Sequence, residues 1–483
     1  MLLILPLILP VAAGLILWAL PGGNRRLERG WLVGALALSA ACALTAALGG
    51  ERSLTLWRLT DAISISLRTD GFARLYLALI SVVWVLAGVY STAYNAHDEH
   101  ARRYDSFYLC TYGILMGLSM SANAVTFYMF YEMMTLITVP LVMHNMDRDA
   151  VAAGIKYLVY SVFGASAALL GIFFLMHFAG TVDFTVGGVL DAAAVAGSEN
   201  LLRAVAFVMI VGFGVKAGMF PMHAWLPTAH PVAPAPASAV LSGVITKMGV
   251  LGAIRTIFYL FGVDFLRGSW VQTAFMTLTL ITVFMGSLLA LREKLFKKRL
   301  AYSSVSQVSY VLFGLSTMTP LGLVGALLHV CCHSLIKDAL FLSAGSIIHE
   351  TGRVRADALT GVGKIMPRTM IAFTIASLGL IGIPPTGGFI SKWYLAQGAL
   401  SAGGGYAWIG PAVLLCSALM TAGYLLTVTI HGFFSGNEPI PEGYEAPAAM
   451  WVPTMLLAIL SVAVGLFPGA LIGWFGRIAE MLF

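Results

Sequence analysis

Long apolar runs with few charges follow one another along almost the whole chain. Only 10% of the residues are charged and 59% are hydrophobic, with a mean hydropathy of +0.88. A typical soluble domain carries roughly 25% charged residues, so a water-soluble fold is excluded. The pattern predicts an all-α polytopic membrane protein with about fourteen spans of roughly 20 residues each. We expect them near residues 1–20, 31–48, 72–94, 106–121, 123–144, 155–179, 203–222, 236–262, 270–290, 301–318, 321–348, 369–398, 407–434 and 449–476.

The basic residues indicate how the chain is oriented. Its net charge is +6, and loops on one expected face carry most of the arginines and lysines, among them Arg25, Arg103, Arg148 and Lys298. Cytoplasmic loops of membrane proteins are enriched in these residues. We therefore expect a cell (inner) membrane protein with both termini on the non-cytoplasmic side. The surplus charge then reflects topology, and no nucleic-acid partner is predicted.

Two spans are interrupted by proline, one at Pro221 and the other at Pro384 and Pro385. Proline removes a backbone donor, and broken helices persist at membrane depth where protein or a wet cavity satisfies the freed groups. Lys216 precedes the first break, whereas Lys392 follows the second. This reversal is what two repeats of opposite orientation require.

The breaks lead to a division of the chain into four segments. We predict an N-terminal three-helix segment at 1–105, a first inverted repeat with spans four to eight at 106–262, a second with spans nine to thirteen at 263–434, and a C-terminal helix at 435–483.

Ionisable residues inside the spans need a reason, because each costs roughly 2.5 to 3.5 kcal/mol at a helix centre. Glu132 is expected to be neutral if isolated and charged if a lysine lies nearby. Pairing with Lys216 is the preferred interpretation, and a protonated glutamate bonded to a neighbouring helix is the alternative. Lys216 and Lys247 are interpreted as proton carriers, or alternatively as ion pairs that hold helices together. Arg255 lies close enough to a span end to snorkel and is given no role.

The stripe LLHVCCHSLIKDALF places His329, His333 and Lys337 at i, i+4 and i+8, on one helical face. Groups spaced in this way are suited to passing a proton along the helix. Structural hydrogen bonding is the alternative, and HxxxH is also a metal-ligand spacing, but the sequence offers no obvious third ligand. Asp338 falls off this face and is interpreted as a supporting partner or a helix contact.

Two further histidines, His223 and His230, border the first break. Unwound backbone there would admit water, so both are candidates for proton entry from the cytoplasmic side. A helix-capping role is the alternative. No P-loop, CxxC pair, haem or flavin motif is found, so no cofactor is expected, and any redox chemistry would belong to partner subunits.

With these residues in view, the chain closely resembles the antiporter-like subunits of respiratory complex I and of membrane-bound hydrogenases. It also closely resembles the D-type subunit of multisubunit sodium/proton antiporters. The resemblance covers nearly the whole chain. It rests on Glu132, on Lys216 with FPMHAWLPTAHPVAPAPASAVLSG and Lys247, and on KRLAYSSVSQVSY, HVCCHSLIKDALFLSAG and GIPPTGGFISKWYL, which contains Lys392. It implies two inverted five-helix repeats and a switching pair of Glu132 and Lys216. It also implies a central hydrated axis through Lys247 and the histidines, and a gating role for Lys392.

The expected function is therefore proton translocation along a buried line of Glu132, Lys216, Lys247, His329, His333, Lys337 and Lys392. The chain is expected to work with other membrane subunits in a redox-driven pump of the NADH:quinone oxidoreductase or hydrogenase type. The main alternative is a D-type subunit of a sodium/proton antiporter, with Na⁺ as a possible second ion. A structural scaffold explains none of the costly buried charges, and no sequence feature names a solute for a solute carrier.

Overall fold

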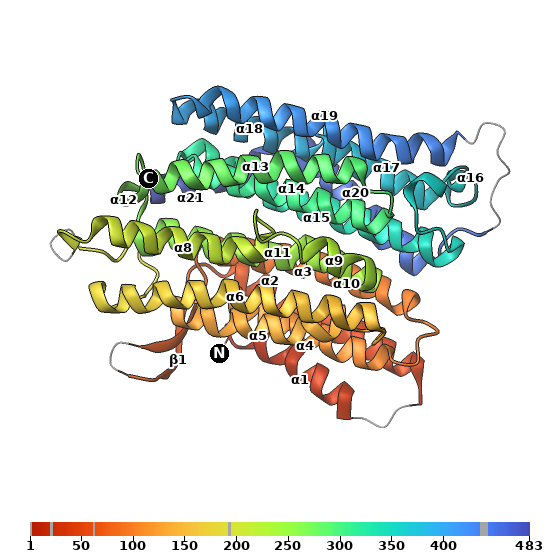
Figure 1. Ribbon diagram of the computed structural model, residues 1–483. Helices are drawn as coiled ribbons and strands as arrows, with labels where there is room; N and C mark the ends of the chain where they lie inside the picture. The colour runs from red at the N-terminus through yellow and green to blue at the C-terminus, as the bar shows by residue number, and fades with distance from the viewer. Residues whose placement is uncertain (1, 20–22, 61–62, 192–194, 435–442) are drawn as a thin grey trace.

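The chain forms a bundle of long helices that lie roughly side by side (Figure 1). The computed structural model describes residues 2–19, 23–60, 63–191, 195–434 and 443–483. This architecture confirms the all-α polytopic class. The α-helices are α1 (Leu5–Ala19), α2 (Arg25–Leu48), α3 (Gly71–Tyr94), α4 (Ala101–Ser119), α5 (Ala124–Val142), α6 (Arg148–Ala179), α8 (Glu199–Ala217), α9 (Leu226–Val232), α10 (Ala235–Val240), α11 (Thr246–Arg255), α12 (Val263–Leu266), α13 (Trp270–Arg292), α14 (Phe296–Ser316), α15 (Pro320–Thr351), α16 (Val362–Ile365), α17 (Pro367–Ile381), α18 (Gly387–Ala402), α19 (Tyr406–Phe433), α20 (Ala448–Leu466) and α21 (Gly469–Leu482). Two π-helical segments, η1 (Leu241–Ile245) and η2 (Thr256–Phe261), and a short 3₁₀ turn, η3 (Ala356–Ala358), complete the helical elements.

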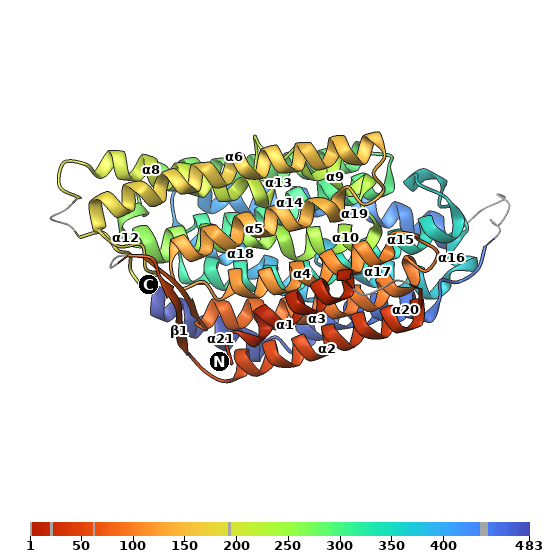
Figure 2. The same ribbon diagram turned by 90° about the horizontal axis from the view of Figure 1, so that it is seen from below.

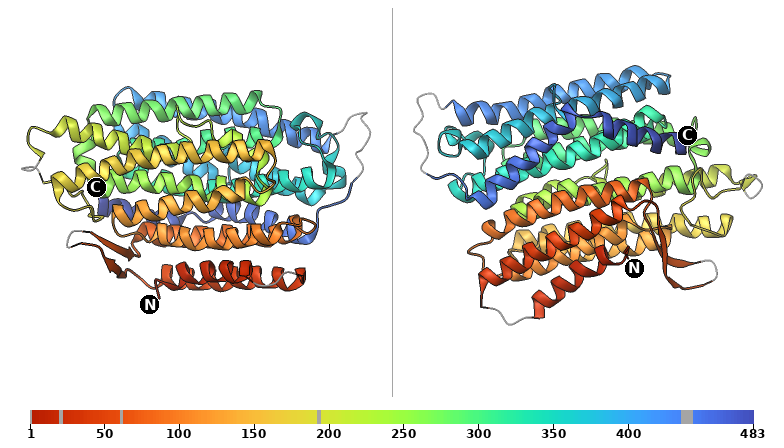
Figure 3. Two further views of the ribbon diagram at one scale, coloured as in Figure 1. Left: turned by 60° about the horizontal axis from the view of Figure 1, so that its bottom comes forward. Right: turned by 180° about the vertical axis from the view of Figure 1, so that it is seen from behind.

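Within the described residues, ten helices are long and apolar enough to cross a membrane, and α1 and α17 are shorter apolar helices. The total of fourteen spans stays a prediction. Both ends of the chain lie toward the same end of the bundle (Figure 3). Seen from below, α2 and α6 lie at opposite edges, with α4 and α5 between them (Figure 2).

A β-hairpin that the sequence pattern did not predict lies between α2 and α3. Strand β1 (Ser53–Arg58) pairs antiparallel with β2 (Ser64–Arg68), with an irregularity between Thr55 and Trp57. The alternating residues of SISLR are a weak strand signal, which the apolar runs on both sides obscured. The hairpin lies at the end of the bundle where both termini lie (Figure 1).

Both predicted helix breaks are present. Helix α8 ends at Ala217 and α9 begins at Leu226, so that Pro221 lies in the gap. Helix α17 ends at Ile381 and α18 begins at Gly387, with Pro384 and Pro385 between them. The backbone carbonyls left free at the end of α17 are used in the site described below.

The centre of the bundle consists of two spans. One runs continuously from α10 through η1 and α11 to η2, and its residues 235–261 are all buried. The other is α15, in which every residue from Gly322 to Ile347 is buried. Small residues permit close packing here: a Cβ added to Gly249 would lie 2.5 Å from the Phe213 carbonyl oxygen of α8. A helix that is buried all round must satisfy its polar side chains within the protein.

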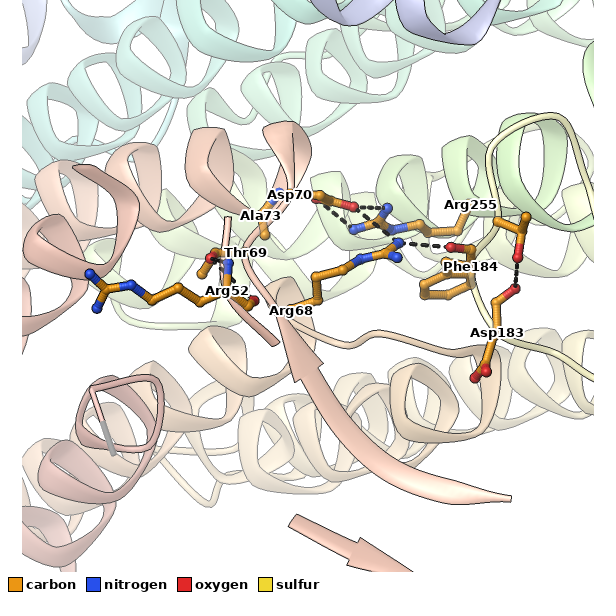
Figure 4. Close-up of polar contacts among 9 residues, drawn as sticks. Arg52, Arg68, Thr69, Asp70, Ala73, Asp183, Phe184 and Arg255 are labelled. Atoms are coloured by element: carbon orange, nitrogen blue, oxygen red, sulfur yellow. Dashed lines mark hydrogen bonds and ion pairs between the residues drawn. The ribbon is translucent and has the colours of Figure 1, made fainter. Parts of the chain in front are cut away.

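A buried ion pair joins α3 to the end of α11, which corrects the interpretation of Arg255 as a snorkelling residue. Arg255 is 2% exposed, and its two terminal nitrogens donate to the Asp70 carboxylate at 2.5 and 3.0 Å (Figure 4). Asp70 also caps α3 by accepting from the Ala73 backbone N–H. The guanidinium lies over the rings of Tyr259 and Phe184, at 4.7 and 4.8 Å. Arg255 therefore has a structural role, which depends on residues far away in the sequence.

Candidate functional site

Lys216 lies in the last turn of α8, fully buried, and its ammonium is bound by hydroxyl groups. Its Nζ donates to Thr135 Oγ1 of α5 at 2.9 Å, and to Tyr157 OH and Ser161 Oγ of α6 at 3.0 and 2.8 Å. The ammonium also lies 4.4 Å from the centre of the Tyr157 ring. Three neutral acceptors satisfy its three donors. In this conformation the Lys216 ammonium makes its three hydrogen bonds to hydroxyl groups and to no carboxylate.

Glu132 lies on α5, three residues before Thr135, so the two share a helix face. Its side chain is half-buried at the edge of the bundle. Among the ion pairs that the described residues form, none joins Glu132 to Lys216, although Lys216 attracts the carboxylate electrostatically. Glu132 thus lies about one turn along α5 from Thr135, which binds the ammonium, and direct pairing of Glu132 with Lys216 stays a prediction.

Lys247 lies at the start of α11, immediately after the wide turn η1, and is fully buried. Its ammonium donates to the Ser242 carbonyl oxygen in η1 and, at 3.4 Å, to Thr246 Oγ1. Tyr76 of α3 donates its hydroxyl proton to the Lys247 carbonyl oxygen at 3.1 Å. Lys247 is therefore held by its own helix, near the middle of the bundle.

The two histidines of α15 lie next to each other, and one of them reaches α18. The ring centres of His329 and His333 are 5.8 Å apart. His329 Nδ1 lies 2.9 Å from Ser391 Oγ, and its ring stacks on Tyr310 at 5.4 Å. Lys247 lies within electrostatic range of both histidines. Neither ring nitrogen of His333 has a hydrogen-bond partner among the described residues, so a proton path from Lys247 through His333 and His329 stays a prediction.

Lys392 of α18 also lies close to Tyr310. Its Nζ lies 5.1 Å from the Tyr310 ring centre and donates to the Leu380 and Ile381 carbonyl oxygens at 2.6 and 2.9 Å. These carbonyls belong to the broken end of α17. Lys392 is half-buried, like Glu132.

Lys337 of α15 and His230 of α9 both lie near the ring of Phe341. Lys337 is fully buried and donates to Leu300 O at 3.0 Å and to Ser303 Oγ of α14. His230 stacks on Phe341 at 4.6 Å, and the Lys337 ammonium lies 5.9 Å from the same ring. Neither ring nitrogen of the buried His230 has a hydrogen-bond partner among the described residues. A role of His230 in proton entry stays a prediction.

His223 is the second histidine of the first break, and it is half-buried. Its ring stacks on Phe220 at 6.2 Å, and its Nδ1 has no hydrogen-bond partner among the described residues. The structure does not bring it into contact with His230, so the two belong to different parts of the break.

A cavity of about 310 Å³ opens at the end of the bundle opposite the β-hairpin and reaches Pro231, next to His230. His144 and Asp98 lie on its wall, with Nε2 and Oδ2 2.5 Å apart. Burial lowers the pKa of His144 more than Asp98 raises it. Burial acts to raise the pKa of Asp98, but the hydrogen bonds from His144 and from the His100 backbone N–H hold it below its usual value. At neutral pH a neutral His144 therefore donates to a charged Asp98. Further lining residues include Tyr94, Asn95, Lys297, Lys298 and His349.

The hydroxyl ligands of Lys216 were missed in the sequence, as was the placement of Asp338 at the centre of the bundle. The available signal was a polar spacing of four residues within an apolar run, as in Tyr157 and Ser161. Within the described chain, no group of three or more His, Cys, Asp or Glu residues is arranged to hold a metal ion. The arrangement of lysine, histidine and hydroxyl groups is suited to moving protons over short steps.

Comparisons with known proteins give a consistent result. The family model described as "NADH:quinone oxidoreductase/Mrp antiporter, TM" matches residues 121–421. The chain is 34% identical to the N-type subunit of NADH-quinone oxidoreductase from Desulforudis audaxviator, covering 83% of this chain and 82% of that protein. It is 32% identical to Hydrogenase-4 component B of Escherichia coli, covering 83% of this chain and 62% of that longer protein. It is 27% identical to the D-type subunit of the Na(+)/H(+) antiporter from Alkalihalophilus pseudofirmus, covering 96% and 93%.

Solved structures share the fold. A chain of the Mrp complex from Dietzia sp. superposes with a TM-score of 0.87 at 23% identity, covering 99% of this chain and 97% of that one. A chain of respiratory complex I from Thermus thermophilus superposes with a TM-score of 0.82 at 22% identity, over the full length of both. The chain therefore belongs to the family of membrane subunits shared by NADH:quinone oxidoreductases and Mrp antiporters.

Proposed function

We propose that the chain is a proton-translocating subunit of a multisubunit redox-driven ion pump. The observation that carries the proposal is that Lys216, Lys247, His329 and His333 are all buried inside the bundle, and that His329 and Lys392 both lie against the Tyr310 ring. Burying so many ionisable side chains in a membrane protein is costly, and such residues commonly mark ion pathways. A scaffold would have no use for them.

The first step is a switch between Glu132 and Lys216. In the structure the Lys216 ammonium is bonded to Thr135, which follows Glu132 by about one turn of α5. Rotation of the flexible lysine side chain toward Glu132 would favour the charged lysine. Return to the uncharged hydroxyl ligands would favour loss of its proton. Movement of the lysine therefore controls whether it holds or passes on the proton.

Proton entry is proposed at the end of the bundle with the cavity. We assign this end to the cytoplasm because the loops around it carry most of the basic residues. His230 directly precedes Pro231, which lines the cavity. Neither of its ring nitrogens has a hydrogen-bond partner among the described residues, so we take it as the first acceptor. His223 stays a second candidate at the break itself.

The half-buried positions of Glu132 and Lys392 support a multisubunit assembly. Each lies at an edge of the bundle, where a neighbouring membrane subunit would cover it and complete its charge environment. Similarity to the N-type and component B proteins favours a redox-driven parent complex. The D-type antiporter subunit is the second candidate, because that similarity extends over 96% of this chain.

The test is substrate-driven acidification of inverted membrane vesicles that contain the intact parent complex, with and without sodium. Lys216→Ala and Glu132→Ala should abolish proton pumping while the complex still assembles. Lys294→Met, at an exposed lysine, is the control and should pump normally. Unchanged pumping by Lys216→Ala would refute the mechanism. Sodium-dependent proton movement without a redox substrate would favour the antiporter.

A further inference from the structure

Asp338 places a carboxyl group at the centre of the bundle, and the proposed pathway gives this residue no role. It lies in α15 with no exposed surface. Neither of its carboxyl oxygens has a hydrogen-bond partner among the described residues. Buried polar groups are nearly always hydrogen-bonded, and an unpaired buried carboxylate is costly. A residue of this kind requires a partner that can reach it.

The carboxyl group is positioned against the wide turn η1. A Cβ added to Gly243 would lie 1.6 Å from Asp338 Oδ2 and 3.0 Å from Oδ1. The glycine therefore provides the space that the carboxyl group occupies. One turn before Asp338 on α15, Ser334 donates its hydroxyl proton to the Gly243 carbonyl oxygen at 2.5 Å. This bond fixes α15 and η1 at the point where Asp338 meets Gly243.

Lys247 is four residues beyond Gly243 on the same span and attracts the Asp338 carboxylate electrostatically. In this conformation its ammonium is bonded to Ser242 O and Thr246 Oγ1. Lys337, the neighbour of Asp338, is bonded to α14 through Leu300 and Ser303. Neither ammonium is therefore bonded to Asp338 in this conformation. The Lys337 ammonium is bonded to another helix, whereas the Lys247 ammonium is bonded only to groups of its own span.

We propose that Asp338 is the carboxyl partner of Lys247, and that one proton passes between the Lys247 ammonium and the Asp338 carboxylate. An N–H bond breaks and an O–H bond forms, which converts the charged pair into a neutral amine and a neutral acid. The net charge of the pair is unchanged, and no electrons move. Asp338 would then give Lys247 the movable counter-charge that Glu132 gives Lys216. This inference rests on the proposed function.

A double-mutant cycle on the intact complex tests the pairing. Lys247→Met and Asp338→Asn each leave one buried ionisable group alone, so each should lower the Tm. The double variant removes both groups and should recover part of the loss. Asp105 of α4, also a buried carboxyl group, provides the matched control: Asp105→Asn combined with Lys247→Met should show no recovery.

Transport completes the test. Asp338→Asn should abolish proton pumping in complexes that assemble normally. Assembly of the double variant where a single variant fails would count as recovery. Additive Tm changes, or pumping by Asp338→Asn at the wild-type rate, would overturn the inference. Failure of the proposed function would appear separately, as normal pumping by Lys216→Ala, while the Tm cycle still decides whether Asp338 and Lys247 form a pair.

Discussion

Replacement of Asp70 by asparagine should destabilise the protein by about 3 to 5 kcal/mol, because it leaves Arg255 buried without its counter-charge. Asp70 and Arg255 have 9% and 2% of their side chains exposed, so solvent screens the pair little. Arg68 is 3.7 Å from the same carboxylate and 31% exposed, and its loss of attraction adds little. Asparagine caps a helix about as well as aspartate, so this variant removes the charge and keeps the cap of α3.

Alanine at the same position separates the two roles of Asp70. It also removes the bond to the Ala73 backbone N–H, and loss of an N-cap costs about 1 kcal/mol more. Asp70→Asn combined with Arg255→Met should recover much of the loss, because the unpaired cation is removed as well.

Thermal or denaturant-induced unfolding in detergent, followed by circular dichroism, measures these differences. A loss below about 1 kcal/mol for Asp70→Asn, the range of a surface ion pair, would refute the view that this variant leaves Arg255 buried without a counter-charge. Equal losses for the asparagine and alanine variants would refute the separate contribution of the cap.

Two further predictions concern the cavity wall and the glycine at η1. Because the pKa of His144 is lowered in the folded protein, the unfolded chain takes up a proton at this residue at a higher pH, beginning below about 6.5. The stability of the wild type should therefore decrease from pH 7 toward pH 5.5 more steeply than that of His144→Gln. Thermal unfolding measures the two slopes, and equal slopes would contradict this prediction. Gly243→Ala should lower the free energy of unfolding by about 1 to 3 kcal/mol, because the added methyl group overpacks against Asp338. Combining it with Asp338→Ala should recover part of this loss. Gly30→Ala, where an added Cβ meets nothing within 4 Å, should cause no loss.

The helical breaks and the ionisable residues inside the spans could be predicted from the sequence because each has a local cause. Pro221, Pro384 and Pro385 cannot continue a hydrogen-bonded helix, and the buried lysines stand out in apolar runs. The stripe of His329 and His333 follows from helical periodicity alone. These features depend on a few neighbouring residues in the chain, which the sequence displays directly.

Other features depend on how distant segments pack. Tyr157 and Ser161 are ordinary residues of an apolar helix until α6 is placed against α8. Many similar hydroxyls, such as that of Thr111, bond only to their own helix. Asp70 and Arg255 are separated by 185 positions, and neither has a local signal that identifies the other. Such contacts follow from tertiary register, which one sequence does not specify.

The wide turn at η1 determines which neighbours the central span faces. On one side of it Gly243 meets Asp338 of α15, and on the other Gly249 lies against α8, where an added Cβ would be 3.1 Å from Lys216 Cβ. Deleting one residue from the turn would rotate everything beyond it by about 100°. Gly249 would then lose its contact with α8, and Lys247 would be directed toward a different helix. The length of a single turn thus decides whether Lys247 and Gly249 meet the helices that the proposed ion path requires.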